Sequence, residues 1–177
     1  SLFCRVLAGK LDLMPPFPEI EASFKSVQAS ESADDTDPAE LRGAVNALER
    51  AKDATIYSAM KAAIKYMQGL ENEQEFIECL ASIMIDLYAT DSALARAIQA
   101  VRRGDENSAT HVKLAQLATW LAFSRIRSNL DQLIMTNTDA DRVEKELARI
   151  RTYIGDYILN GVAVQRELAA TVVEKQG

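Results

Sequence analysis

The sequence predicts an all-α fold, an up-down-up-down bundle of four long helices preceded by an N-terminal tail and a linker. Three observations predict it. Apolar residues recur at steps of three and four over most of the chain, without the alternation typical of β-strands. Alanine is frequent and aromatic residues make up only 6%, which favours helices in close contact over a sheet. The 177 residues include only 7 glycines and 4 prolines, so few positions would interrupt a helix.

Residues 1–16 and 17–37 are predicted to precede the bundle, which occupies residues 38–177. The first segment has the short apolar pattern of a tail that belongs to a preceding domain, and three prolines near its end stop any helix. The second contains the polar, acidic run ASESADDTD and is predicted to be a flexible linker. Residues 1–37 carry 3 basic and 7 acidic residues, most of the net charge of −6. Because the chain opens at Ser1 without a methionine, we expect a piece of a longer protein.

The first long helix is predicted to begin at Asp37 and Pro38 and to end near Gly69. An aspartate before a first-turn proline is a strong helix start, and glycine is a good stop. Its apolar stripe consists of Leu41, Val45, Leu48, Ile56, Met60, Ala63 and Met67.

The second helix is predicted from Asn72 to Arg103 and carries the clearest apolar seam in the chain. Asn72 is the expected cap, arginines occupy the last turn, and Gly104 ends the helix. Polar residues interrupt the seam at its middle, at Thr90 and Asp91. The seam consists of Phe76, Leu80, Ile83, Leu87, Leu94, Ile98 and Val101.

The third helix is predicted from Asn107 or Ser108 to Met135, and its wide apolar arc predicts the most buried helix of the four. The fourth is predicted to start at Thr138 or Asp139 and to run past residue 170. Its apolar spacing stays in phase across Gly155 and Gly161, which favours one long helix in which these glycines permit another helix to approach closely. A kink is the alternative.

Composition excludes several classes of protein. There is no basic stripe, which disfavours nucleic-acid binding, and no apolar run of 18 residues that could span a membrane. With Cys4 in the tail, Cys79 on a helix and His111 as the only histidine, neither a disulfide framework nor a zinc site is expected. Phosphate-binding loops and nucleophile motifs are not found. Trp120 and four methionines are interpreted as packing residues, namely Met60, Met67, Met84 and Met135.

Asp86 and Asp91 are the most informative polar residues. Asp86 lies beside the seam of the second helix and Asp91 interrupts it, and a charge in such a place usually finds a cation. Arg125 and Arg127 on the third helix are the natural partners. We hypothesise an interhelix pair between Asp86 and one of these arginines that fixes the register of the two helices; the alternative is that the charges are solvated.

Two blocks of sequence resemble the C-terminal domain of acyl-CoA dehydrogenases of the very-long-chain type. The resemblance covers roughly residues 40–135. The first block is Asn72-Glu73-Gln74, Leu80-Ala81, Ile85-Asp86-Leu87-Tyr88-Ala89 and Leu94-Ala95-Arg96-Ala97, and the second is Ala122-Phe123-Ser124-Arg125-Ile126-Arg127. The order and spacing of the blocks agree with that family.

The resemblance implies a parent flavoprotein that converts a fatty acyl-CoA to its 2,3-enoyl form, with FAD as hydride acceptor. The base and the FAD-binding segments would belong to an upstream catalytic region, so no catalytic, cofactor or metal residue is assigned here. The implied role is packing on the enzyme's own catalytic domain and assembly of a homo-dimer. The implied location is the bacterial cytoplasm or the mitochondrial matrix. In either place the enzyme could be free or peripheral to the inner membrane.

Two alternatives remain. The chain could be a membrane-attachment module of the same enzyme, although its acidic linker opposes binding to anionic lipid. It could also be a stand-alone helical adaptor or binding protein.

Overall fold

The computed structural model describes residue 22 and residues 36–174. Within these residues the fold is all-helical and contains no strand, which confirms the predicted fold class. The predicted tail (1–16) and nearly all of the predicted linker (17–37) lie outside the described residues. The elements are α3 (Ala39–Tyr66), the 3₁₀ helix η1 (Met67–Asn72), α4 (Gln74–Arg103), α5 (Ser108–Asn137), α6 (Val143–Ile154) and α7 (Gly161–Glu174).

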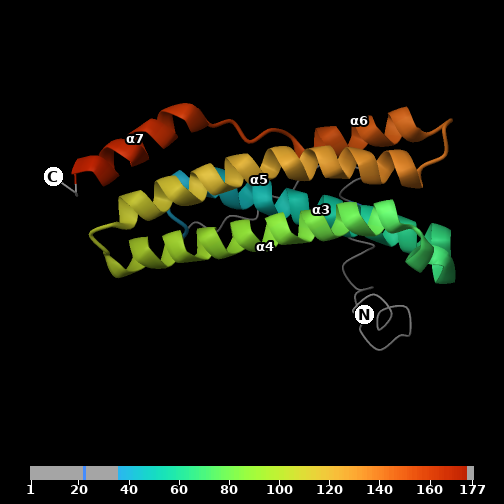
Figure 1. Cartoon of the computed structure of the whole chain (residues 1–177), viewed down its shortest axis with the longest axis horizontal. Helices are drawn as coiled ribbons and strands as arrows, with labels where there is room; N and C mark the ends of the chain where they lie inside the picture. The colour runs from blue at the N-terminus through green and yellow to red at the C-terminus, as the bar shows by residue number, and fades with distance from the viewer. Residues whose placement is uncertain (1–21, 23–35, 175–177) are drawn as a thin grey trace.

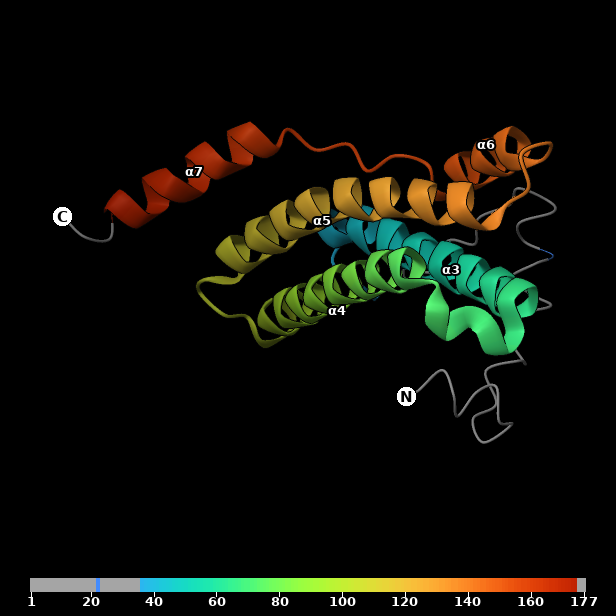
Figure 2. The same ribbon diagram turned by 45° about the vertical axis from the view of Figure 1, so that its right-hand side comes forward.

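Three long helices, α3, α4 and α5, lie side by side and enclose the core (Figure 1). Helix α5 packs against α3, α4, α6 and α7. Figures 1 and 2 both show α6 and α7 on the side of α5 away from α4. The bundle therefore has three continuous members and a fourth that is divided between two short helices.

Several predicted helix limits agree closely with the structure. Helix α5 begins at Ser108 with Asn107 in the cap position, as predicted. Helix α4 ends at Arg103, and Gly104 adopts the left-handed conformation with φ of 66° that glycine allows at low cost. The cap at the start of α4 is Glu73, one residue after the predicted Asn72.

Two expectations for the first and third helices were wrong. The first helix ends at Tyr66 and not near Gly69, and Met67 adopts the positive φ of 47° that closes it. Gly69 lies inside η1. The most buried helix is α3, with eleven buried residues against eight in α5. Six of the eleven buried residues of α3 are alanines, whose small side chains are covered where α3 packs against its neighbours.

The prediction of one long fourth helix was also wrong. Gly155 has φ of 62° and ends α6, and an irregular segment of residues 155–160 leads to α7. The apolar phase persists because Tyr157 still points inward, with its ring 6.4 Å from that of Phe123 in an edge-to-face contact. Gly161 does permit a close approach, since a Cβ there would lie 2.5 Å from the ring of Trp120 on α5.

Candidate functional site

The candidate site is an exposed apolar stripe on α4, which we call the outer stripe. Three members have large exposed fractions: 51% for Met84, 69% for Ile85 and 78% for Tyr88. The stripe consists of Ile77, Ala81, Met84, Ile85 and Tyr88. These positions recur at helical spacing, so they form one face of the helix. Contiguous exposed apolar surface of this kind marks an interaction site more often than a chance surface.

The outer stripe lies opposite the seam that α4 buries in the core. Phe76, Ile83, Leu87 and Leu94 are buried, and among the described helices α4 packs mainly against α3 and α5. No other described helix lies on the far side of α4 in either view of the ribbon (Figures 1 and 2). The same helix therefore presents one apolar face to the core and a second apolar face to the outside.

Asp86 and Arg125 meet at the edge between α4 and α5. Arg125 donates from Nη2 to Oδ1 of Asp86 at 2.5 Å and from Nε to Oδ2 at 3.0 Å. The hydrogen bond to Asp86 raises the pKa of the Arg125 guanidinium. The side chain of Asp86 is 14% exposed and that of Arg125 is 57% exposed. The pair is bidentate, but solvent screens its outer half.

The other predicted polar residues have different partners. Arg127 pairs with Asp156 in the segment that follows α6. Asp91 is exposed and accepts from Lys52 of α3 at 2.8 Å, while Lys52 also binds Glu49. The buried interruption of the seam is Thr90, which is 2% exposed and whose hydroxyl has no hydrogen-bond partner within the structure.

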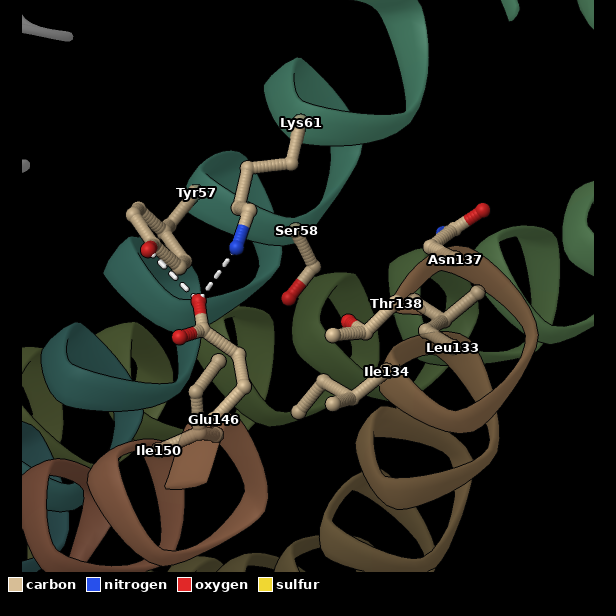
Figure 3. Close-up of a pocket in the computed structure, with 9 residues that line it drawn as sticks. All are labelled: Tyr57, Ser58, Lys61, Leu133, Ile134, Asn137, Thr138, Glu146 and Ile150. Carbon is tan, nitrogen blue, oxygen red and sulfur yellow. Dashed lines mark hydrogen bonds and ion pairs between the residues drawn. The ribbon is translucent and has the colours of Figure 1, made fainter. Parts of the chain in front are cut away.

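A second group of polar side chains joins α6 to α3 around Glu146 (Figure 3). Oε1 of Glu146 accepts from the Tyr57 hydroxyl at 2.6 Å and from Nζ of Lys61 at 2.5 Å. Arg149 binds the other carboxylate oxygen at 3.4 Å. Nearby, the Tyr153 hydroxyl donates to Asp53 at 2.7 Å. These contacts attach α6 firmly to the bundle.

Burial and hydrogen bonding act in opposite directions on Glu146. Burial alone would raise its pKa, but hydrogen bonds from Lys61 and Tyr57 outweigh it, and the pKa of Glu146 lies below its usual value. Burial, with the hydrogen bond to the Glu146 carboxylate, raises the pKa of Tyr57 to about 12. The group is therefore a carboxylate held ionised by its donors, which is a structural arrangement and not a poised acid.

A small cavity of about 10 Å³ adjoins this group. Ser58 is 4% exposed. Neither its hydroxyl nor the side-chain amide of Asn137 has a hydrogen-bond partner among the described residues. Figure 3 shows both side chains beside the cavity between α3 and the end of α5. A space of this size holds about one water molecule, which is too small for a substrate.

A wider hollow lies where the fourth bundle member is divided. It measures about 180 Å³ and is lined by Trp120, Phe123, Tyr157 and the Arg127–Asp156 pair. Pockets for small molecules and cofactors usually measure roughly 300–1,000 Å³. In the described part of the chain there is no cluster of histidine, cysteine, aspartate and glutamate that could hold a metal ion. None of the described helices is long and apolar enough to cross a membrane.

Comparison with known proteins identifies the family. A sequence model described as "Acyl-CoA dehydrogenase, C-terminal domain" matches residues 50–152, more than half of the chain. This chain belongs to that family. The matched range of the acyl-CoA dehydrogenase C-terminal domain contains α4, α5 and most of α3 and α6, and therefore includes the outer stripe and the Glu146 group.

Two relatives show how this C-terminal domain compares with longer proteins. A probable acyl-CoA dehydrogenase of Bacillus subtilis (strain 168) is 26% identical over 130 residues, which cover 73% of this chain and 22% of the relative. The crystal structure of an acyl-CoA dehydrogenase complexed with FAD from Bacillus anthracis has the same fold, with a TM-score of 0.87 and 24% identity. That match covers 98% of this chain and 29% of the solved chain. The chain thus spans less than a third of either relative.

Sequence reasoning missed the outer stripe because it interpreted the methionines as packing residues. Met67, Met84 and Met135 are more than half exposed, so for them that interpretation was wrong. Trp120 is half-buried and lines the hollow. The signal for the stripe was present, since Ile77, Ala81, Met84, Ile85 and Tyr88 have the spacing of a second apolar face. The Glu146 group had no such signal, because its donors lie 85 and 89 residues away in the chain.

Proposed function

We propose that this domain is a non-catalytic part of an FAD-dependent acyl-CoA dehydrogenase and that it serves domain packing and dimer assembly. The single observation that carries the proposal is the outer stripe of α4. Its apolar side chains are exposed in the domain by itself, and burying them against a partner is favourable by about 25 cal/mol per Å². The family membership supports a partner within the same enzyme: its own catalytic domain, a second subunit, or both.

The reaction proposed for the parent enzyme is α,β-dehydrogenation of a fatty acyl-CoA. FAD would accept the hydride in the catalytic region, as the family resemblance implies. The two cavities described above, of about 10 and about 180 Å³, do not fit a group as large as FAD. The residues of this chain would contribute to the reaction only by holding the catalytic region in its assembled form.

We also propose that the chain consists of three segments. Residues 1–16 would end the catalytic domain, residues 17–37 would link it to the bundle, and residues 38–177 would form the C-terminal domain. The very-long-chain type is proposed from the two sequence blocks. Both relatives come from bacteria, which favours the cytoplasm over the mitochondrial matrix.

The proposal is tested with the purified 177-residue chain and with the longer parent protein. The isolated chain should retain no bound flavin after incubation with FAD and removal of the free FAD. It should not oxidise palmitoyl-CoA in the presence of an artificial electron acceptor. The parent should bind flavin and oxidise palmitoyl-CoA, and it should prefer long over short acyl chains. Flavin binding or dehydrogenase activity in the isolated chain would overturn the non-catalytic assignment, and a parent without flavin would overturn the assignment of the enzyme.

A further inference from the structure

We infer that α4 pairs through its outer face with α4 of a second copy of this chain, antiparallel, about a two-fold axis that crosses the outer face at the level of position 87. The inference rests on the proposed role in assembly and names the partner of the outer stripe. It follows from how charge and side-chain size are distributed along the exposed face of α4.

The exposed charges of α4 are opposite in sign at its two ends. Glu78 lies on the acidic side and Arg96 on the basic side, and both are exposed. Neither forms an ion pair with any other described residue. The helix dipole acts mainly within the first and last turns, whereas Glu78 lies beyond the first turn and Arg96 well before the last. Their placement therefore favours a partner outside this domain.

The spacing of these charges fits an antiparallel pair. Glu78 and Arg96 each lie nine residues from position 87 of α4. In an antiparallel pair with its axis at the level of this position, Glu78 faces Arg96 of the second copy. At 1.5 Å per residue this contact lies about 13 Å from the axis. Two-fold symmetry forms each contact twice. A parallel pair would instead place Glu78 against its own counterpart.

Side-chain sizes along the outer face agree with the same register. Ile85 would lie opposite Ala89 of the second copy, and Ala81 would lie opposite Ala93. One large residue opposite a small one, and two small residues opposite each other, let the two helices approach closely. Tyr88 lies next to the axis, where its exposed ring would be covered by its counterpart. The charges and the side-chain sizes therefore favour one arrangement, in which the partner is a second copy of this chain.

The contact is small. The face between Glu78 and Arg96 is about 27 Å long and, at a helix width of about 10 Å, covers roughly 300 Å². Stable complexes bury about 800 Å² per partner. The isolated chain should therefore associate weakly and reversibly, and the remainder of a stable interface would come from elsewhere in the parent enzyme.

The first test is a charge swap measured by sedimentation equilibrium of the 177-residue chain over a wide concentration range. Glu78→Arg and Arg96→Glu should each weaken self-association about tenfold, because each places like charges in contact twice. The double variant should restore it. Lys145→Glu, at an exposed position of α6, is the matched control and should have no effect. A wild-type chain that stays monomeric, or a double variant as weak as the singles, overturns the inference.

The second test locates the axis with single cysteines in a Cys4→Ser, Cys79→Ser background. Tyr88→Cys should form a disulfide-linked dimer under mild oxidation, since the two thiols meet at the axis. Gln99→Cys is the control, because its thiols would lie about 36 Å apart at 1.5 Å per residue. Equal cross-linking of the two variants, or cross-linking of Gln99→Cys alone, overturns the register. Because the readouts are mass and cross-linking, the pairing can fail while flavin chemistry in the parent still supports the proposed enzyme.

Discussion

Ile83 and Ile85 are two residues apart on α4 and have the same side chain, yet one is buried and the other is 69% exposed. Ile83 belongs to the seam that packs on α3 and α5, whereas Ile85 belongs to the outer stripe. The two side chains point to opposite sides of the helix, and α3 and α5 cover only the side of Ile83. Helix α4 therefore has two apolar faces with separate roles: one stabilises the bundle, and the other is available for a partner.

The largest effect is expected for Ile83→Ala. Removing a fully buried isoleucine leaves a cavity in the core and should lower the free energy of unfolding by about 2–5 kcal/mol. Ile85→Ala is the matched control and should change it by less than about 0.5 kcal/mol. Urea unfolding followed by circular dichroism measures both. Equal losses for the two variants would show that the faces do not differ in role.

The Glu146 group allows the bundle to be weakened far from α4. Glu146→Ala leaves Tyr57 and Lys61 without their acceptor and should cost about 2–3 kcal/mol. Because α6 lies on the other side of α5 from α4, self-association of the folded protein should stay unchanged (Figure 1). A parallel loss of association would mean that association only reports stability.

The pH dependence of stability tests the same group. The pKa of Glu146 is lowered in the folded protein, so its stabilising contribution is complete above its ordinary value of 4.5 and is lost as pH falls below it. Glu146→Gln cannot titrate and should show a smaller loss of stability below pH 4.5 than the native protein. Urea midpoints measured across this range check the sign, and identical pH profiles would contradict it.

Gly161→Ala should loosen α7 without disturbing α4. The added Cβ would lie 2.5 Å from the ring of Trp120, and relieving that clash should cost about 1–3 kcal/mol. Trp120 is the only tryptophan, so its fluorescence reports the displacement directly. Gly43→Ala is the control: its Cβ would make an ordinary contact at 3.9 Å with Tyr157, and alanine inside α3 should stabilise by about 0.5–1 kcal/mol. Unchanged fluorescence in Gly161→Ala would refute the close contact.

A smaller loss of stability is expected for Asp86→Asn, at the edge between the two faces. The guanidinium of its partner Arg125 is largely exposed, so losing the ion pair should cost no more than about 1 kcal/mol. If the pair fixes the register of α4 on α5, amide hydrogen exchange along this edge should accelerate more than the small loss of stability accounts for. Exchange rates equal to those of the native protein would leave the pair without that role.

The sequence was sufficient for features that depend on local chemistry. The end of α4 at Gly104 follows from a glycine after a basic last turn, and the start of α5 follows from a polar cap before an apolar repeat. The division of the fourth helix could not be predicted in this way. Tyr157 keeps the apolar phase although the backbone has left the helix, because an irregular segment can bury the same side chain.

The candidate site was hidden for a related reason. Apolar periodicity locates both stripes of α4 but does not by itself say that the second stripe stays uncovered, since that depends on where the other helices pack. Met84 therefore resembled a core residue until its surroundings were known. The Asp86 and Arg125 side chains are an intermediate case: both residue types and the adjacent helices were evident, but the choice of Arg125 over Arg127 required the geometry of α5.

The most direct test of the separate roles of the two α4 faces is sedimentation equilibrium of Ile85→Ser beside the native chain, with unfolding in urea measured on the same samples. Ile85→Ser should keep native stability within about 0.5 kcal/mol and should be monomeric at concentrations where the native chain associates. A variant that associates as strongly as the native chain would show that the outer stripe does not mediate self-association.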